Sequence, residues 1–408
     1  MNIKITPAQL FGEVSAIASK SVAHRQLICA SFSDAPTKII CPEISKDIIA
    51  TADCLKALGA EITYENSQFN IIPISKPNEN AHLNCGESGS TLRFMLPIVS
   101  ALGVKTTFKM EGRLPKRPLS PMWEELINHG AVLEKPTEDT IRVSGQLDNN
   151  PFSIRGDISS QFITGLLFSL CVLEEPTQIK VTTPIESMPY INITNEVLGD
   201  FGVNVILKDN IFSIKGKPTT KGVYKSDGDW SNGAFWLCAD KLSKKSVKCT
   251  GLSQNSPQGD KEILNILDEL DKYESEIDGR NIPDLIPIVS VVASVSKGTT
   301  VIKNAQRLRI KESDRILSTF ELIKNLGGKC EITPYGLIIE GVEKLKGGKV
   351  SSFNDHRIAM SAAIASIVCE NEVIINGAEA VEKSYPAFWE DFKKLGGKYH
   401  ILNKGEKL

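Results

Sequence analysis

The chain has 408 residues, which is too long for one ordinary hydrophobic core, so two domains of roughly 200 residues each are the default expectation. Charged residues make up 24% of the chain and hydrophobic residues 41%, which are ordinary values for a globular protein. The formal net charge is -2, so bulk charge excludes the usual nucleic-acid and anionic-membrane binders. Any site for an anion must therefore be built locally.

Neither a targeting segment nor a metal-binding pattern stands out. The first seven residues contain no charged segment followed by an apolar run, and no apolar span of about 18 residues occurs, which predicts a cytoplasmic protein. The nine cysteines are scattered singly, without a CxxC pair or neighbouring histidines. We therefore expect thiols in the core rather than a metal site or disulfides.

One short phrase, a helix end followed by glycine, recurs along the chain and indicates an internal repeat. Its copies lie at 57–60, 128–131, 200–203, 325–328 and 394–397, with a degenerate copy at 267–270. Each copy should end an amphipathic helix, because glycine is a common helix stop. The alternating runs that follow it predict hairpins, for example 61–64 with 69–72 and 330–333 with 337–340.

A second helix, small and apolar on almost every face, precedes each amphipathic helix and should lie inside a domain. Polar residues open these six helices at 19–21, 87–90, 159–161, 229–231, 283–284 and 355–357. Three repeats are expected to close one domain. The last copy has one strand, 398–401, which residues 1–6 should complete. The predicted domains are 19–227, and 1–18 together with 228–408.

The openings of the buried helices are predicted anion sites, because unpaired N–H groups and helix dipoles converge there. Hydroxyls and a glutamine offer neutral hydrogen bonds, while arginine clamps phosphate or carboxylate with two donors. Taken singly, a Ser-Ser pair is more often a helix cap and a lone arginine a surface residue. Recurrence at equivalent positions of a repeat favours binding by Lys20, Ser21, Arg25, Arg93, Ser159, Ser160, Gln161, His356 and Arg357.

The stretch 307–315 holds six ionisable residues and precedes an apolar stripe that predicts a helix from Ile316. We expect Lys311 and Arg315 to share one helical face. Glu312 and Asp314 should fall in the first turn, where the helix dipole favours carboxylates. The alternative for this stretch alone is a solvated, capped helix start.

The chain resembles the 5-enolpyruvylshikimate-3-phosphate synthase (3-phosphoshikimate 1-carboxyvinyltransferase) family over nearly its whole length. Nine motifs occur in the family's order, at 19–21 with Arg25, 86–93, 116–118, 159–162, 187–190, 283–284, 308–315, 355–359 and 383–386. The resemblance implies an α/β fold, a two-domain inside-out barrel. Each domain would have three βαβαββ-type units with buried parallel helices, and the active site would lie in the cleft between the domains.

The resemblance also implies a reaction. The enolpyruvyl group of phosphoenolpyruvate is transferred to the 5-hydroxyl of shikimate 3-phosphate, and phosphate is released, on the pathway to chorismate and the aromatic amino acids. Asp284 would be the base, and Glu312 or Lys20 the acid. No metal, organic cofactor, nucleic acid or membrane is implied, and a monomer is expected.

Substrate-binding residues follow from the same motifs. Shikimate 3-phosphate would be held by Lys20, Ser21, Arg25, Ser159, Ser160, Gln161, Ser187, Asp284 and Lys311. Phosphoenolpyruvate would be held by Lys20, Gly89, Arg117, Gln161, Arg315, Arg357 and Lys383. These positions supply seven cations, which suits a substrate pair that carries on the order of -5 to -6.

One residue departs from the family pattern, and other functions compete. Glu87 stands where the family commonly has asparagine, so its carboxylate should face away from the donor or pair with Arg93 or Arg117. The nearest rival is a UDP-N-acetylglucosamine enolpyruvyl transferase, but that family opens with Lys-Asn and carries a loop cysteine with no counterpart near 114–118. A non-catalytic phosphometabolite-binding protein and part of a fused pathway polypeptide are further alternatives. The retained Asp284, Glu312 and Lys20 disfavour a pure binder.

Overall fold

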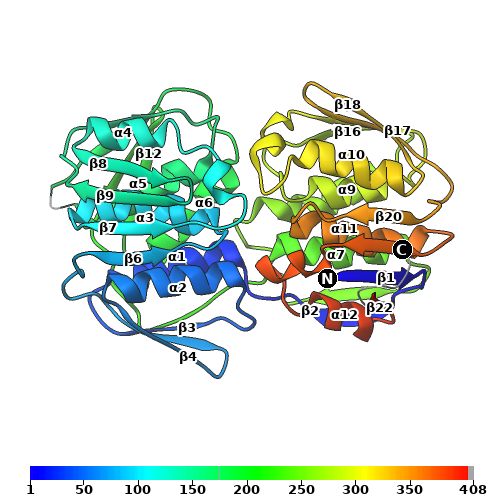
Figure 1. The fold of residues 1–408 in the computed structure, drawn as a ribbon, viewed down its shortest axis with the longest axis horizontal. Coiled ribbons are helices and arrows are strands. Elements are labelled where there is room, and N and C mark those ends of the chain that lie inside the picture. The colour runs from blue at the N-terminus through cyan, green and yellow to red at the C-terminus, as the bar shows by residue number, and fades with distance from the viewer. Residues whose placement is uncertain (174, 403–408) are drawn as a thin grey trace. The chain divides into compact units, whose positions relative to one another are not determined.

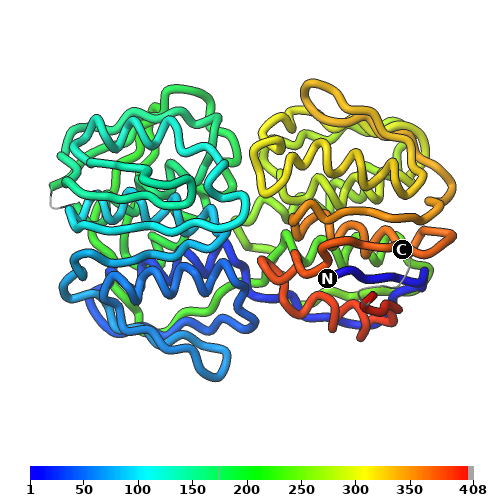
Figure 2. Tube along the Cα trace, viewed as in Figure 1, coloured from blue at the N-terminus to red at the C-terminus, as the bar shows by residue number. Residues whose placement is uncertain are grey.

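The computed structural model describes residues 1–173 and 175–402, and the chain divides into two compact units. Unit 1 comprises Met1–Ile17 and Gly228–Leu408, and unit 2 comprises Ala18–Asp227. Figure 2 shows the blue N-terminal segment lying among the red and orange C-terminal segments of unit 1. The N-terminal residues therefore complete a unit that is otherwise built from the second half of the chain.

Unit 2 is made of three four-stranded sheets and seven helices in the described residues. Its helices are α1 (Lys20–Ser31), α2 (Lys46–Leu58), α3 (Gly89–Leu102), the 3-10 helix η1 (Leu114–Lys116), α4 (Met122–Asn128), α5 (Ser160–Val172) and α6 (Met188–Asp200). Its strands are β3 (Thr37–Ile40), β4 (Glu61–Glu65), β5 (Gln68–Ile72), β6 (Ala81–Asn84), β7 (Thr106–Lys109), β8 (Ala131–Thr137), β9 (Thr140–Gly145), β10 (Phe152–Ile154), β11 (Gln178–Val181), β12 (Asn204–Lys208), β13 (Ile211–Lys215) and β14 (Val223–Lys225).

Unit 1 repeats this pattern with two four-stranded sheets and one two-stranded sheet. Its helices are α7 (Trp230–Leu242), η2 (Gly259–Glu262), α8 (Ile263–Glu269), α9 (Ile286–Ala293), η3 (Gln306–Ile310), α10 (Arg315–Asn325), α11 (His356–Ala365), η4 (Ser366–Val368), η5 (Ala378–Lys383) and α12 (Phe388–Lys394). Its strands are β1 (Asn2–Thr6), β2 (Gly12–Ser15), β15 (Val247–Thr250), β16 (Glu274–Asp278), β17 (Thr299–Lys303), β18 (Lys329–Thr333), β19 (Gly336–Glu340), β20 (Gly348–Ser351), β21 (Val373–Asn376) and β22 (Lys398–Leu402).

The five four-stranded sheets share one topology, with one parallel pair followed by two antiparallel pairs. In four of them a buried helix crosses over between the two parallel strands, as α3 does between β6 and β7 (Figure 1). The hairpin strands β4–β5 and β18–β19 pair antiparallel where the alternating runs predicted hairpins. The predicted βαβαββ repeat is therefore confirmed in five of the six copies, whereas the copy that contains α7 and α8 has the two-stranded sheet β15–β2 and no hairpin in the described residues.

The two kinds of helix predicted from the sequence are both present in each unit. All eight residues of α9 and all ten of α11 are buried, as expected for helices that are apolar on every face. The amphipathic helix α2 ends at Leu58. Gly59 follows with a φ of 120°, a backbone conformation that residues other than glycine rarely adopt. The glycine phrases thus mark the ends of α2, α4, α6, α10 and α12, and the degenerate copy marks the end of α8.

The N-terminal strand β1 lies between β21 and β22 in the last sheet. Its register pairs Ile3 with Ile375 on one side and with Ile401 on the other. The prediction that residues 1–6 complete the sheet of the last repeat is confirmed. This pairing places both ends of the described chain in one sheet of unit 1 (Figure 1).

One local prediction is wrong, in the stretch 307–315. Residues 306–310 form the 3-10 helix η3. The helix α10 begins at Arg315, one residue before the predicted start at Ile316, and the Asp314 side chain caps it by accepting a hydrogen bond from the backbone N–H of Leu317. Lys311 and Glu312 therefore precede the helix, and Lys311 does not share a helical face with Arg315. Asp314 is the N-cap, as its residue type favours, rather than a residue of the first turn.

Candidate functional site

Three buried helices of unit 2 begin with a serine cap, so part of each helix N-terminus is already satisfied. The side chains of Ser19, Ser88 and Ser159 each accept one backbone N–H of the first turn. The remaining N–H groups of these turns and the helix dipoles are available to an anion. The helices concerned are α1, α3 and α5, which carry most of the candidate residues of this unit.

A chain of buried hydrogen bonds connects α1 to the start of α3. His24 Nδ1 lies 2.7 Å from Thr51 Oγ1, which lies 2.6 Å from Thr91 Oγ1, and the Thr91 hydroxyl donates to Ser88 Oγ. Burial, followed by the charges of Lys20 and Arg25, lowers the pKa of His24 well below its usual value, so its ring is neutral. His24 therefore has a structural role in this chain of hydrogen bonds.

Arg25 is a buried cation, 2% exposed, whose hydrogen-bond acceptors are all neutral. Its Nε donates to Thr194 Oγ1 at 2.8 Å, its Nη1 to the Ser21 carbonyl at 2.6 Å and its Nη2 to the Tyr190 carbonyl at 3.0 Å. Burial lowers the pKa of the Arg25 guanidinium to about 9. Among the described residues Arg25 therefore has no carboxylate partner, which makes it a candidate for the local anion site that the overall charge of the chain does not provide.

The starts of α3 and α5 meet at a pair of arginines. Arg93 donates to Gln161 Oε1 at 2.8 Å and to the Pro118 carbonyl at 2.9 Å, while Gln161 Nε2 donates to Ser90 Oγ at 2.9 Å. A Cβ atom at Gly89 would lie 2.5 Å from Arg117 Nη1. The structure therefore brings Gly89, Gln161 and Arg117 together around one short turn.

Five further candidates belong to unit 2. The Lys20 ammonium pairs with Asp47 Oδ2 at 2.9 Å, and both side chains are largely buried. Ser187 is buried and adopts a φ of 57° at the start of α6, the helix whose first turn supplies the Tyr190 carbonyl to Arg25. Ser160 is also buried, and Ser159 and Ser21 are half-buried.

Glu87 faces a glycine loop. A Cβ atom at Gly112 would lie within 2.3 Å of Glu87 Oε2, so the carboxylate rests on the backbone of that loop. Gly112 has a φ of 56°, which favours glycine for a second reason.

Unit 1 contains a second cluster, in which carboxylates surround two buried arginines. Arg315 donates through Nη1 to Asp284 Oδ1 at 2.7 Å, through Nη2 to Glu312 Oε2 at 2.9 Å and through Nε to Asp355 Oδ2 at 2.8 Å. Arg357 donates through Nη2 to Asp284 Oδ2 at 3.1 Å. Asp284 thus bridges the two guanidinium groups.

Opposing charges shift the pKa values of this cluster. Burial alone would raise the pKa of Asp284, but the positive charges of Arg357, Arg315 and Lys311 outweigh it and hold that pKa far below its usual value. Burial lowers the pKa of Lys311 to about 8, against the opposing pull of Asp284 and Glu312. The cluster therefore favours an ionised Asp284 and a Lys311 that titrates near neutral pH.

Lys383 lies beside this cluster. Its Nζ donates to the Asn354 carbonyl at 2.7 Å, one residue before Asp355. The next residue, Ser384, accepts a hydrogen bond from Asn232 Nδ2 at 3.1 Å. In unit 1 the structure therefore gathers Asp284, Glu312, Arg315, Arg357, Lys311 and Lys383 around the starts of α7, α10 and α11.

Sequence reasoning did not assign roles to the residues that accept hydrogen bonds from these cations. Asp47 pairs with Lys20, Asp355 pairs with Arg315, and Ser231 binds Arg357 through its carbonyl and its hydroxyl. Asp355 stands inside a motif that the sequence analysis noted, and Asp47 follows Ser45, the cap of α2. Neither the motif around Asp355 nor the helix cap before Asp47 shows which cation the carboxylate contacts, because each pair joins residues far apart in the chain.

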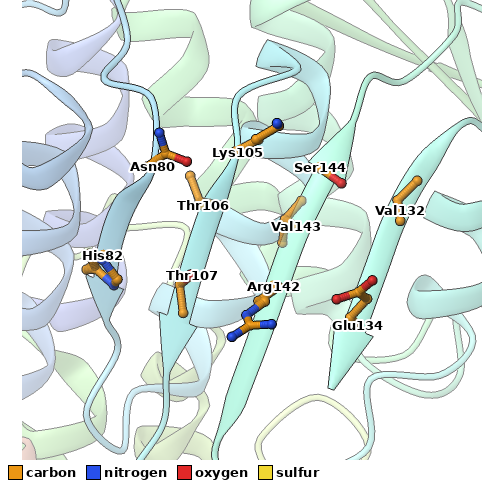
Figure 3. A pocket seen from close by; sticks show the side chains of 10 residues that line it. All are labelled: Asn80, His82, Lys105, Thr106, Thr107, Val132, Glu134, Arg142, Val143 and Ser144. Atoms are coloured by element: carbon orange, nitrogen blue, oxygen red, sulfur yellow. The ribbon is translucent and has the colours of Figure 1, made fainter. Parts of the chain in front are cut away.

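A cavity with a volume of about 350 Å³ lies elsewhere, on the outer face of the β6–β7–β9–β8 sheet (Figure 3). His82, Thr107, Arg142 and Glu134 form one row across its four strands. None of the candidate residues lines this cavity. The cavity is lined by exposed polar side chains of this sheet and does not include the helix N-termini.

Two general expectations can be set beside the structure. All nine cysteines are free thiols, eight of them buried and Cys249 partly exposed, as expected for core residues. Among the residues that the structure describes, none of the helices combines the length and apolar character needed to cross a membrane.

The fold, with buried cations clustered near helix N-termini in each unit, is that of a two-unit α/β protein of the inside-out barrel class. The model of the EPSP synthase (3-phosphoshikimate 1-carboxyvinyltransferase) family matches residues 5–279 and 271–392. A 3-phosphoshikimate 1-carboxyvinyltransferase of Clostridium beijerinckii is 42% identical over 99% of this chain and 100% of the relative. The chain belongs to the EPSP synthase family.

Solved structures confirm the fold. An EPSP synthase from Acinetobacter baumannii superposes with a TM-score of 0.80 at 23% identity, covering 98% of this chain and 100% of that one. The enolpyruvyl transferase NikO from Streptomyces tendae superposes with a TM-score of 0.78 at 16% identity, covering 98% of each chain. The predicted inside-out α/β fold and the family resemblance are both confirmed.

Proposed function

We propose that this chain is a 3-phosphoshikimate 1-carboxyvinyltransferase, which transfers the enolpyruvyl group of phosphoenolpyruvate to the 5-hydroxyl of shikimate 3-phosphate and releases phosphate. The observation that carries this conclusion is the 42% identity to a curated enzyme of that activity over 99% of the chain. The buried Arg25 supplies a local positive charge, and the two arginines at Asp284 supply guanidinium donors for the phosphate and carboxylate groups of the substrates.

Residues of both units act on the same pair of substrates in this proposal. Shikimate 3-phosphate is bound by Lys20, Ser21, Arg25, Ser159, Ser160, Gln161, Ser187, Asp284 and Lys311. Phosphoenolpyruvate is bound by Lys20, Gly89, Arg117, Gln161, Arg315, Arg357 and Lys383. The neutral partners of Arg25 support the first assignment, because an anion would meet an uncompensated charge there. The close approach of Arg117 to Gly89 supports the second.

The chemistry is an addition followed by an elimination. Asp284 accepts the proton of the 5-hydroxyl while that oxygen bonds to C2 of phosphoenolpyruvate, and an acid protonates C3 to give a methyl group. Loss of a proton from that methyl group then expels phosphate, which restores the double bond in the product. Glu312 and Lys20 are the two candidate acids. Glu312 lies next to Arg315, and Lys20 is paired with Asp47.

Release of phosphate from phosphoenolpyruvate tests the function. The full chain should release phosphate with shikimate 3-phosphate as acceptor and not with UDP-N-acetylglucosamine. Asp284→Ala should lose most of the turnover, while Asp271→Asn, which removes a carboxylate from an exposed ion pair with Lys241, should keep it. Release with the nucleotide sugar alone would overturn the assignment, and near-normal turnover in Asp284→Ala would exclude Asp284 as the base.

The acid can be assigned separately. Incorporation of solvent deuterium into the methylene group of the product reports protonation of C3, so it should be lost in the variant that lacks the acid. Comparison of Glu312→Gln with Lys20→Met therefore distinguishes the two candidates.

We also propose that the protein is a monomer, which light scattering tests, and that it is cytoplasmic, which cell fractionation tests.

A further inference from the structure

The two arginines proposed to hold phosphoenolpyruvate already have most of their hydrogen-bond donors engaged. A guanidinium group has five N–H donors. Arg315 makes four hydrogen bonds, two to Asp355 and one each to Asp284 and Glu312. Arg357 makes four through Nη1 and Nη2, to the Ser231 carbonyl and hydroxyl, Asn232 Oδ1 and Asp284 Oδ2. Each group therefore has one N–H left, the Nε–H of Arg357 and one Nη1–H of Arg315, so a phosphate or carboxylate that binds either group through two donors must replace a protein acceptor.

Charge leads to the same requirement. Around these arginines the positive charges of Arg315, Arg357 and Lys311 face the negative charges of Asp284, Glu312 and Asp355. Lys383 adds one positive charge beside this cluster, and Asp229 and Asp260 add two negative charges that act on Arg357, so the cluster as a whole offers no net attraction for an anion. Phosphoenolpyruvate carries about three negative charges. It can bind these arginines favourably only if one of the carboxylates moves away from them.

Of the three carboxylates, Asp284 is the one that an incoming anion can displace from the arginines most easily. Asp355 is fully buried and also accepts hydrogen bonds from Ser313 Oγ and from the backbone N–H of Arg357, so it belongs to the framework. The side chain of Asp284 is 20% exposed, and each of its hydrogen bonds goes to an arginine. It also touches both arginines, whereas Glu312 contacts Arg315 through Nη2.

We propose that Asp284 is an internal competitor of the donor substrate, occupying the guanidinium edges of Arg315 and Arg357 that an anionic group of the donor takes when it binds. This inference rests on the proposed function, and it gives the proposed base a second role. While both arginines contact Asp284, the carboxylate is a poor proton acceptor. Transfer of the arginines to the donor exposes the carboxylate to the acceptor hydroxyl and restores its basicity.

The direction of the pKa shift agrees with this coupling. The pKa of Asp284 is held far below its usual value by Arg357, Arg315 and Lys311, which outweigh the opposite effect of burial. An anion bound to the same arginines neutralises their charges and lets the pKa of Asp284 rise. The base is therefore activated by arrival of the donor, so that proton abstraction is disfavoured before the reaction partner is in place.

Titration of the full chain with inorganic phosphate tests the inference without turnover. The Asp284→Asn variant should bind phosphate at least about tenfold more tightly than the wild type, because two buried guanidinium groups lose their shared counter-ion. The charge-conserving Asp284→Glu and the surface variant Asp271→Asn should remain within about twofold of the wild type. Repeating the comparison with Arg25→Met added to each protein removes phosphate binding at Arg25 from the signal.

Equal or weaker phosphate affinity in Asp284→Asn would overturn the inference. If that variant is unstable, thermal melting gives the same comparison at matched ionic strength. The inference requires phosphate to raise its melting temperature at concentrations about tenfold below those that act on the wild type. An identical concentration dependence contradicts it. Product formation by the wild type is measured separately, so an active wild type with no affinity gain in Asp284→Asn would overturn this inference and leave the proposed function standing.

Discussion

Substitution of Arg25 by methionine should separate binding from stability. Arg25 is 2% exposed and donates to Thr194, Ser21 and Tyr190, none of which offers a negative charge. Its guanidinium group also lies 5.1 Å from the centre of the Phe94 ring. Methionine keeps much of the side-chain volume and makes favourable contacts with an aromatic ring, so the packing is largely preserved while the charge is lost.

Two opposing effects set the magnitude. Burial lowers the pKa of Arg25 from its usual 12.5 to about 9, which at 1.36 kcal/mol for each tenfold change corresponds to a cost of about 5 kcal/mol for keeping the charge in the fold. The variant is relieved of this cost but loses three hydrogen bonds donated by a charged group, each worth about 1.5 to 3 kcal/mol. Its free energy of unfolding should therefore fall by no more than about 4 kcal/mol relative to the wild type.

Binding should respond very differently. A phosphate held by two charge-assisted hydrogen bonds gains about 3 kcal/mol or more, so Arg25→Met should bind shikimate 3-phosphate at least about 100-fold more weakly. Calorimetric titration measures the affinity and urea unfolding the stability. Arg155→Met, at an exposed ion pair with Asp157, should change neither quantity. Large destabilisation of Arg25→Met with unchanged affinity would refute an anion-binding role for Arg25.

The remaining predictions concern both units. Because burial lowers the pKa of Lys311 to about 8, the protonated form is lost as pH rises through that value, so kcat/KM should fall above about pH 8 and should not fall there in Lys311→Arg. Gly89→Ala places a Cβ atom 2.5 Å from Arg117 Nη1 and should raise the KM for phosphoenolpyruvate about tenfold, whereas Gly199→Ala, with open space around it, should leave it unchanged. Arg315→Ala should lower the unfolding free energy by about 3 to 5 kcal/mol, because it leaves buried carboxylates without their cation. Lys311→Ala should abolish turnover with little loss of stability. Thermal melting and turnover of both variants check these two predictions.

The repeat was predictable because its signals are local. Glycine at a helix end, a helix apolar on every face and two alternating runs each depend on neighbouring residues, and all recur at a regular spacing. The ends of α2 and α10 and the hairpin β18–β19 therefore lie where the sequence places them, within a residue or two. The start of α10 was less predictable, since Asp314 could serve as the cap or as a first-turn carboxylate.

The residues that pair with the predicted cations could not be predicted from the sequence, because the pairs depend on tertiary packing. Lys20 and Asp47 are 27 residues apart, Arg315 and Asp355 are 40 apart, and Arg357 and Ser231 are 126 apart. The sequence predicts that Arg315→Ala would abolish turnover with little loss of stability, because Arg315 is expected to bind substrate and not to support the fold. The structure changes that expectation, because Arg315 is 1% exposed and contacts three carboxylates.

The counter-ions also change the charge balance of the proposed active site. The sequence supplies seven candidate cations, against on the order of -5 to -6 on the two substrates. Four carboxylates contact or bridge these cations, which leaves three net positive charges, and the four are Asp47, Asp284, Glu312 and Asp355. Two bound substrates would therefore bring an excess of negative charge, and such an excess raises carboxylate pKa values and favours uptake of a proton. Glu312 is 25% exposed, so a proton from solvent can reach it, and protonation there would provide the acid that the methylene carbon needs.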